Sequence, residues 1–379
     1  MKYDLLIKGG EVLDPGRGLG GRLDVALAKG RIVELAEAIP ASSAKEVFGA
    51  AGLLVTPGLI DLHTHLGWPI HEVVVPVDET CLRSGVTTCV DAGSTGAYTF
   101  PWFRRRVIEP SRTRLLPFLN ICSIGAIAVH TPYYEEKAIE YADVDEAVRT
   151  VEENRDLIVG IKVFAAQNMV GEHGLENLKR AREAADRAGV PLMVHISVAP
   201  PPVEVVVAFL RAGDILTHSF TEHSQRILDE NGSLRAEVLE AWNRGAILDI
   251  GHGSGSFNFE IAEAMFVQGY RPDTISTDLY GGNVHGPVYD LPTTLSKFLL
   301  LGMSLEEVIM AATIRPAKAL RVEGKIGSLK VGGVGDVAVL ALEEGEFQFW
   351  DAQGNLRTGK KRLRAILTVR GGVPGPVMR

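Results

Sequence analysis

The chain has 379 residues, of which 46% are hydrophobic and 23% charged, and its formal net charge at pH 7 is −8. This length and apolar content support a sizeable core in one large domain with a smaller one beside it, and the negative charge argues against nucleic acid as a partner. The sequence has no signal-peptide pattern and no run near the ~20 apolar residues of a membrane span, so we expect a cytoplasmic protein without membrane partners.

Both ends of the chain are rich in short β patterns. Residues 4–58 alternate apolar and polar side chains, interrupted by glycine and proline, and residues 324–372 repeat this style. Such patterns are typical of strands joined by tight turns. We therefore predict a small β-sandwich domain formed by residues 1–55 and 324–379.

Between these ends, short apolar runs alternate with amphipathic segments such as residues 175–189 and 235–245. This alternation is typical of βαβ units and a parallel sheet. Eight repeats of this length fit a (β/α)8 TIM barrel, an α/β fold, better than an open sheet, so we predict a barrel domain over residues 56–323. The eight runs are residues 56–65, 86–93, 114–123, 157–165, 190–197, 214–220, 246–253 and 273–279.

Polar side chains occur at the ends of several of these runs, where a TIM barrel has its active face. Taken singly, an HxH pair can simply end a strand, a histidine after a strand is usually a core residue, and an aspartate can cap the next segment. A lysine within an apolar strand is harder to explain, because lysine is almost never buried unpaired. The set consists of His63, His65, Lys162, His195, His218 and Asp278.

Taken together, these side chains predict a metal centre. Imidazole and carboxylate ligands suit divalent zinc, manganese or iron, and we expect zinc. The set exceeds what one tetrahedral ion needs, which favours two ions. An apolar setting beside cations should lower the pKa of Lys162, and a neutral amine can capture carbon dioxide as an anionic carbamate.

The chain resembles the amidohydrolase superfamily, specifically its binuclear members related to dihydroorotases, hydantoinases and a set of deacetylases. The resemblance covers nearly the whole chain and rests on VTPGLIDLHTH, GVTTCVDAGS, GIKVFA, the two single histidines, TISTDLY and AATIRPAKALRV. The chain is particularly similar to the deacetylase branch in residues 247–279 and in DLPTTLSKFLLLGM.

This resemblance implies a role for each residue. His63, His65 and Asp278 would hold the more buried metal, His195 and His218 the more exposed one, and carbamylated Lys162 would bridge both. A metal-bound hydroxide would attack the carbonyl carbon. Asp278 would act as general base and then as general acid.

Substrate contacts are expected from loops beside this centre. The glycines of residues 251–257 allow close backbone approach, so we expect His252 and Gly253 to line the pocket, although a loop shaped only for turning is equally compatible with the pattern. His285, His130 and Tyr133 are further candidates. His173 and His223 are expected to face solvent.

Three functions remain open. The branch resemblance favours deacetylation of a small N-acyl or O-acyl carboxylic acid. The alternative is a cyclic amidase that opens a ring, as dihydroorotases and hydantoinases do. The third, a scaffold without catalysis, is disfavoured by the complete ligand set. We expect a small-molecule substrate and a homo-oligomer.

Overall fold

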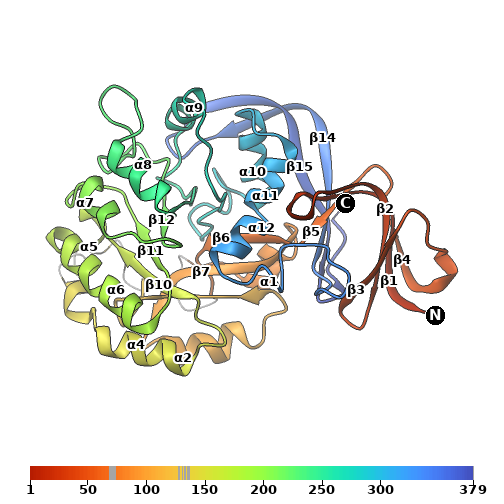
Figure 1. The fold of residues 1–379 in the computed structure, drawn as a ribbon, viewed down its shortest axis with the longest axis horizontal. Helices are drawn as coiled ribbons and strands as arrows, with labels where there is room; N and C mark the ends of the chain where they lie inside the picture. The colour runs from red at the N-terminus through yellow and green to blue at the C-terminus, as the bar shows by residue number, and fades with distance from the viewer. Residues whose placement is uncertain (68–73, 127–128, 130, 132–133, 135–136, 379) are drawn as a thin grey trace.

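The computed structural model describes residues 1–67, 74–126, 129, 131, 134 and 137–378. Two sheets organise the chain, and they lie side by side in Figure 1. One, here called the central sheet, is surrounded by helices. The other, here called the terminal sheet, is built from both ends of the chain and lies at the right of Figure 1.

The terminal sheet joins the two ends of the chain through one pair of strands. β5 pairs with β14 in antiparallel register, with Val55 opposite Val339. The pairing therefore gives one mixed eight-stranded sheet, in the order β16-β15-β14-β5-β1-β2-β3 with β4 beside β1. Its strands are β1 (Tyr3–Asp14), β2 (Leu19–Ala28), β3 (Arg31–Ala36), β4 (Ala44–Gly49), β5 (Leu54–Pro57), β14 (Val337–Trp350), β15 (Leu356–Arg370) and β16 (Val373–Pro374).

The C-terminal strands differ from the sequence pattern. Residues 324–333, expected to be extended, form turns, because Gly327 and Gly332 have positive φ angles of 83° and 84° that interrupt a strand. β14 and β15 instead form one long hairpin that arches toward α9 and α10 (Figure 1). At its tip, Ala352 N donates to Phe257 O over 2.9 Å, so the hairpin contacts the loop after β13.

The central sheet is parallel throughout and curled. Its strand order is β13-β12-β11-β10-β9-β7-β6, with β8 beside β7. Seven of the eight apolar runs thus supply the strands that the sequence predicts. The bounds are β6 (Leu59–Thr64), β7 (Val86–Gly96), β8 (Arg114–Leu115), β9 (Phe118–Asn120), β10 (Gly160–Phe164), β11 (Leu192–His195), β12 (Ile215–Thr217) and β13 (Ile247–Leu248).

The eighth run, residues 273–279, forms isolated bridges and no strand. Thr274 bridges Asp249 beside β13, and Leu279 bridges Thr64 of β6, both in parallel direction. Asp278 has a φ of 50°, which lies outside the strand region and ends a regular ladder there. This segment consequently lies between the two edge strands of the curled sheet.

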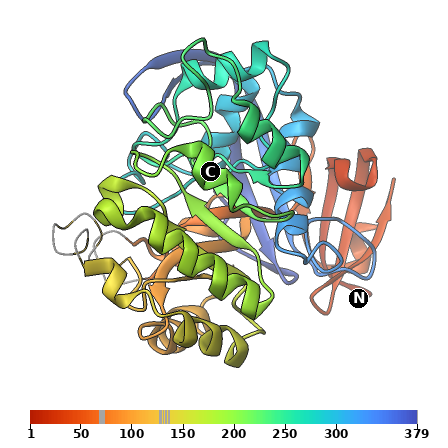
Figure 2. The same cartoon turned by 60° about the vertical axis from the view of Figure 1, so that its left-hand side comes forward.

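Helices cover the outer face of the central sheet, and in Figure 2 those coloured yellow to green lie in front of its strands. α6 ends as the sequence predicts, since Gly189 takes the left-handed conformation at its C-terminus. No described helix is long and apolar enough to cross a membrane. The helices are α1 (Val77–Cys81), α2 (Phe100–Phe103), α4 (Val144–Glu153), α5 (Gln167–Val170), α6 (Gly174–Ala188), α7 (Val203–Ala208), α8 (Ala236–Asn243), α9 (Phe259–Val267), α10 (Leu291–Leu300), α11 (Leu305–Ala311) and α12 (Ile314–Ala319), with short 3-10 or π turns η1 (Pro15–Arg17), η2 (Ala41–Ser43), η3 (Arg104–Ile108), η4 (Ala138–Tyr141) and η5 (Gly171–His173).

Candidate active site

The side chains predicted to bind metal converge at the carboxyl ends of the central strands. Asp278 Oδ1 lies 3.3 Å from His63 Nε2 and 3.2 Å from His65 Nε2. Lys162 Nζ lies 3.2 Å from His63 Nε2. The ring of His218 has its centroid 4.9 Å from that of His63 and 4.3 Å from that of His195. Residues separated by up to 215 positions thus form one cluster, and ligand atoms of His63, His218 and Asp278 lie within 4.8 Å of one another.

Hydrogen bonds fix which nitrogen of two histidines faces this cluster. Thr217 Oγ1 donates to Asp249 Oδ2 over 2.8 Å and therefore accepts the proton of His63 Nδ1 over 2.7 Å. His218 Nδ1 donates to Gly251 O over 2.7 Å. Both rings consequently present the lone pair of Nε2 to the cluster, which is the arrangement of metal-binding histidines.

Glycine is needed where the loop after β13 approaches these groups. A Cβ atom on Gly251, whose φ is 46°, would lie 2.3 Å from Thr217 Oγ1. A Cβ atom on Gly253, whose φ is 54°, would lie 2.5 Å from Asp278 Oδ2. The glycines of this loop therefore let its backbone pack against the candidate metal centre.

Burial sets the charge of the cluster. It lowers the pKa of Lys162 to about 8, although the negative charge of Asp278 opposes the shift. Burial lowers the pKa of His218 to about 4, and burial with the charge of Lys162 lowers the pKa of His63 well below its ordinary value. Near neutral pH these imidazoles are therefore neutral, the form that binds metal.

This donor set fits divalent cations. It combines Nε2 lone pairs with a carboxylate and, in the described region, includes the buried group His63, His218 and Asp278. A protonated Lys162 among these rings would repel a cation, whereas a neutral amine or its carbamate would not. The residues present therefore match the chemistry of a metal centre.

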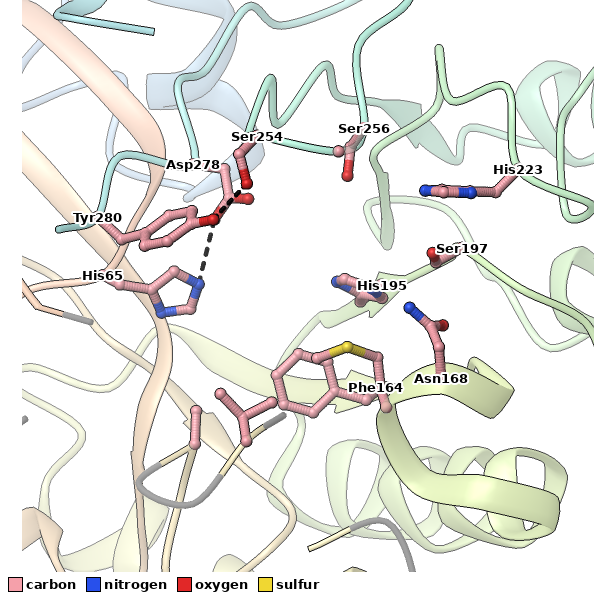
Figure 3. A pocket seen from close by; sticks show the side chains of 14 residues that line it. His65, Phe164, Asn168, His195, Ser197, His223, Ser254, Ser256, Asp278 and Tyr280 are labelled. Carbon is pink, nitrogen blue, oxygen red and sulfur yellow. Dashed lines mark hydrogen bonds and ion pairs between the residues drawn. The ribbon is translucent and has the colours of Figure 1, made fainter. Parts of the chain in front are cut away.

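A cavity of about 150 Å³ opens beside this cluster (Figure 3). His65, His195 and Asp278 reach it from the cluster, so a bound molecule can contact the candidate metal centre directly. Its remaining described lining residues are Ala126, Val129, Phe164, Asn168, Met169, Ser197, His223, Ser254, Gly255, Ser256 and Tyr280.

The expected substrate contacts need correction. His252 is fully buried, and its ring is held by Gly253 O at 2.8 Å and Lys297 Nζ at 2.7 Å, so it does not line the cavity. Gly253 packs against Asp278 and does not line the cavity. His285 is exposed and lies outside the lining, and Tyr133 and His130 fall outside the described residues.

Two side chains lie in surroundings that the sequence did not predict. His223 was expected to face solvent, but it is half-buried and lines the cavity, because the loop after β12 folds back over the strand ends. Lys297 is fully buried on α10. A lysine within an apolar helix face was the available signal for Lys297.

The chain is similar to several known proteins. The model of the Amidohydrolase family matches residues 54–229. A deacetylase of Agrobacterium fabrum is 35% identical and covers 91% of this chain and 84% of that protein, and one of Enterococcus faecalis is 32% identical over 98% and 99%.

Solved structures extend the likeness to the fold. One described as an adenine deaminase has a TM-score of 0.89 at 32% identity, covering 98% of this chain and 99% of its own. One described as a dihydroorotase has a TM-score of 0.88 at 33% identity, covering 98% of each chain. These relatives are named for different reactions, yet they share the fold and extend over nearly the whole chain. The chain therefore belongs to the amidohydrolase family.

Proposed function

We propose that this protein is a metal-dependent hydrolase that deacetylates a small N-acyl or O-acyl carboxylic acid. The observation that carries the proposal is the cluster of Nε2 lone pairs around Asp278 Oδ1, which opens directly into a cavity of small-molecule size. The two relatives named deacetylases, at 35% and 32% identity, support an acetyl group as the group that is removed.

In this proposal His63, His65 and Asp278 hold one divalent ion, His195 and His218 hold a second, and zinc is the native metal. When bound, such ions act as Lewis acids that acidify water and polarise the substrate carbonyl. Asp278 accepts the proton of the attacking water as a carbon–oxygen bond forms. It then returns this proton to the leaving nitrogen or oxygen as the acyl bond breaks.

We also propose that Lys162 carries a carbamate. Its Nζ is fully buried, and its described hydrogen-bond partners are His63 Nε2 and Met193 Sδ, with no carboxylate in contact. The neutral amine would add to the carbon of carbon dioxide and lose one proton, which turns an unfavourable cation into an anionic ligand.

The cyclic amidase remains a second candidate. A solved structure described as a dihydroorotase is 33% identical to this chain. Opening a ring amide requires the same base and metals as deacetylation. A turnover screen of the zinc-loaded protein against N-acetyl and O-acetyl acids, beside dihydroorotate, hydantoins and dihydrouracil, separates the two. Release of acetate is the expected result, and ring opening without deacetylation would contradict the proposal.

The architecture around the site carries related proposals. We infer that residues 273–279 complete a closed (β/α)8 barrel, because they bridge both edges of the curled sheet. Residues 56–323 would form this domain, and residues 1–55 with 324–379 the small β-sandwich domain. We further propose a cytoplasmic homo-oligomer that has no nucleic-acid or membrane partner.

A further inference from the structure

The cavity has two chemically different ends. Asp278, His65 and Tyr280 lie at one end, where the hydroxyl of Tyr280 is hydrogen-bonded to that of Ser254 (Figure 3). Asn168 and His223 lie at the opposite end in the same view. If the acyl bond is cleaved beside Asp278, the rest of the substrate extends toward Asn168 and His223.

Hydrogen-bond donors gather at this far end. Asn168 Oδ1 accepts a long hydrogen bond of 3.4 Å from Val198 N, and its amide nitrogen turns toward the cavity in Figure 3. The ring of His223 points toward the same space, and no described residue hydrogen-bonds to it. Both side chains thus have donors available to a ligand.

No other basic side chain among the described lining residues is placed to bind a carboxylate at this end. The described lining residues include no lysine and no arginine. His223 is therefore the one basic side chain among the described lining residues outside the proposed metal ligands. Asp278 is the sole carboxylate among the described lining residues, and it lies at the other end of the cavity.

We propose that His223, assisted by the amide of Asn168, is the specificity-determining residue that binds the substrate carboxylate. This inference rests on the proposed deacetylation and deepens it. The pair selects acids over neutral analogues while Asp278 acts on the acyl group. Because these contacts are far from the reacting carbon, they bind substrate and transition state alike, so their loss raises KM and spares kcat.

The test compares one acid with its primary amide, using the acetylated acid that the zinc-loaded protein turns over fastest. The wild type is expected to prefer the acid by about tenfold in kcat/KM, the size of one charge-assisted hydrogen bond. His223→Gln should lose most of this preference through a higher KM for the acid, with kcat and the amide reaction nearly unchanged. Asn168→Ala should lose part of it in the same way.

His173→Gln is the matched control, because this histidine lies outside the lining of the cavity. An unchanged acid preference in His223→Gln, or a fall in kcat at constant KM, would overturn the assignment. Failure of the wild type to release acetate from any acid would instead count against the proposed deacetylation, so the two failures are distinguishable.

Discussion

At the scale of single residues, the site depends on partners that orient the candidate ligands. His63 is aligned by Thr217, which is in turn held by Asp249. Asp249 also accepts from the hydroxyls of Thr274 and Ser276, over 2.7 and 2.8 Å. This chain of hydroxyls lets a buried carboxylate fix the tautomer of a histidine that it does not touch.

Replacing Thr217 with valine tests this series of hydrogen bonds. Valine keeps the shape but accepts no proton from His63 Nδ1, so the ring is no longer held in one tautomer and orientation. We expect zinc affinity to fall about 10- to 100-fold, measured by titration against a chelator. Thr87→Val, at another buried threonine of the central sheet, should leave affinity unchanged. Equal zinc affinity in Thr217→Val and wild type would refute the role of Thr217.

Replacing Lys162 with alanine tests the carbamate. The variant should lose zinc and activity, because the buried amine and any carbamate on it are gone. A short-chain carboxylic acid such as propionate should restore both in part, since it can occupy the vacated space with its carboxylate. Elemental analysis and acetate release measure the two effects. Full zinc content in Lys162→Ala without added acid would count against a carbamate of Lys162 that bridges the two ions. The control is Lys325→Ala, at an exposed lysine.

At the scale of elements, α10 fastens three separate segments through one lysine. Lys297 Nζ hydrogen-bonds to His252 Nε2 at 2.7 Å, Pro287 O at 2.9 Å and Trp350 O at 2.7 Å. These acceptors belong to the loop after β13, the segment before α10 and the end of β14. Helix α10 therefore ties the terminal sheet to the loop that packs against Asp278.

Lys297→Met should destabilise the protein by about 1–3 kcal/mol, since buried acceptors lose their donor. Burial lowers the pKa of Lys297 to about 7, against the opposing charges of Asp351 and Asp290. Between about pH 7 and pH 10.5, Lys297 binds its proton more strongly in the unfolded chain than in the folded protein. The wild type therefore gains stability as the pH rises.

The stability gap between wild type and Lys297→Met should therefore widen from pH 7 to pH 9, by at most about 1.4 kcal/mol per pH unit. Urea unfolding at several pH values measures this gap. Exposed Lys318→Met should stay within about 0.5 kcal/mol of wild type at each pH. A constant or narrowing gap would show that the ammonium of Lys297 is not disfavoured by burial.

At the scale of the whole molecule, the terminal sheet shares its core with the central sheet. Leu363 of β15 and Leu340 of β14 belong to the same buried cluster as Leu59 of β6 and Phe298 of α10. Leu363 N also donates to Ser296 Oγ over 2.9 Å. This shared apolar cluster should make the two sheets unfold together.

Leu363→Ala tests this coupling. Removing a side chain that is 1% exposed should cost about 2–5 kcal/mol and lower the unfolding midpoint of the whole chain. Far-UV circular dichroism and tryptophan fluorescence should still report one coincident transition. Leu356→Ala, at a 37% exposed position of the same strand, should cost much less. Two separate transitions would mean that the sheets unfold independently.

The sequence by itself determined the alternation of strands and helices, the parallel central sheet and the identity of the clustered side chains. These follow from local patterns: the apolar period, glycine at helix ends, polar residues at strand ends such as His195, and a lysine within an apolar strand, Lys162. Because parallel strands align their carboxyl ends on one edge, local patterns were enough to bring distant residues together.

Only the tertiary structure decided which residues line the cavity and how the ends of the chain pair. His252 and His223 are both histidines in loops after strands, yet one is buried against Lys297 and the other faces the cavity. The difference arises from long-range contacts, such as the β14–β15 hairpin reaching the loop after β13, which leave no periodic signal in either segment. The positive φ of Asp278 likewise depends on packing between the two sheet edges.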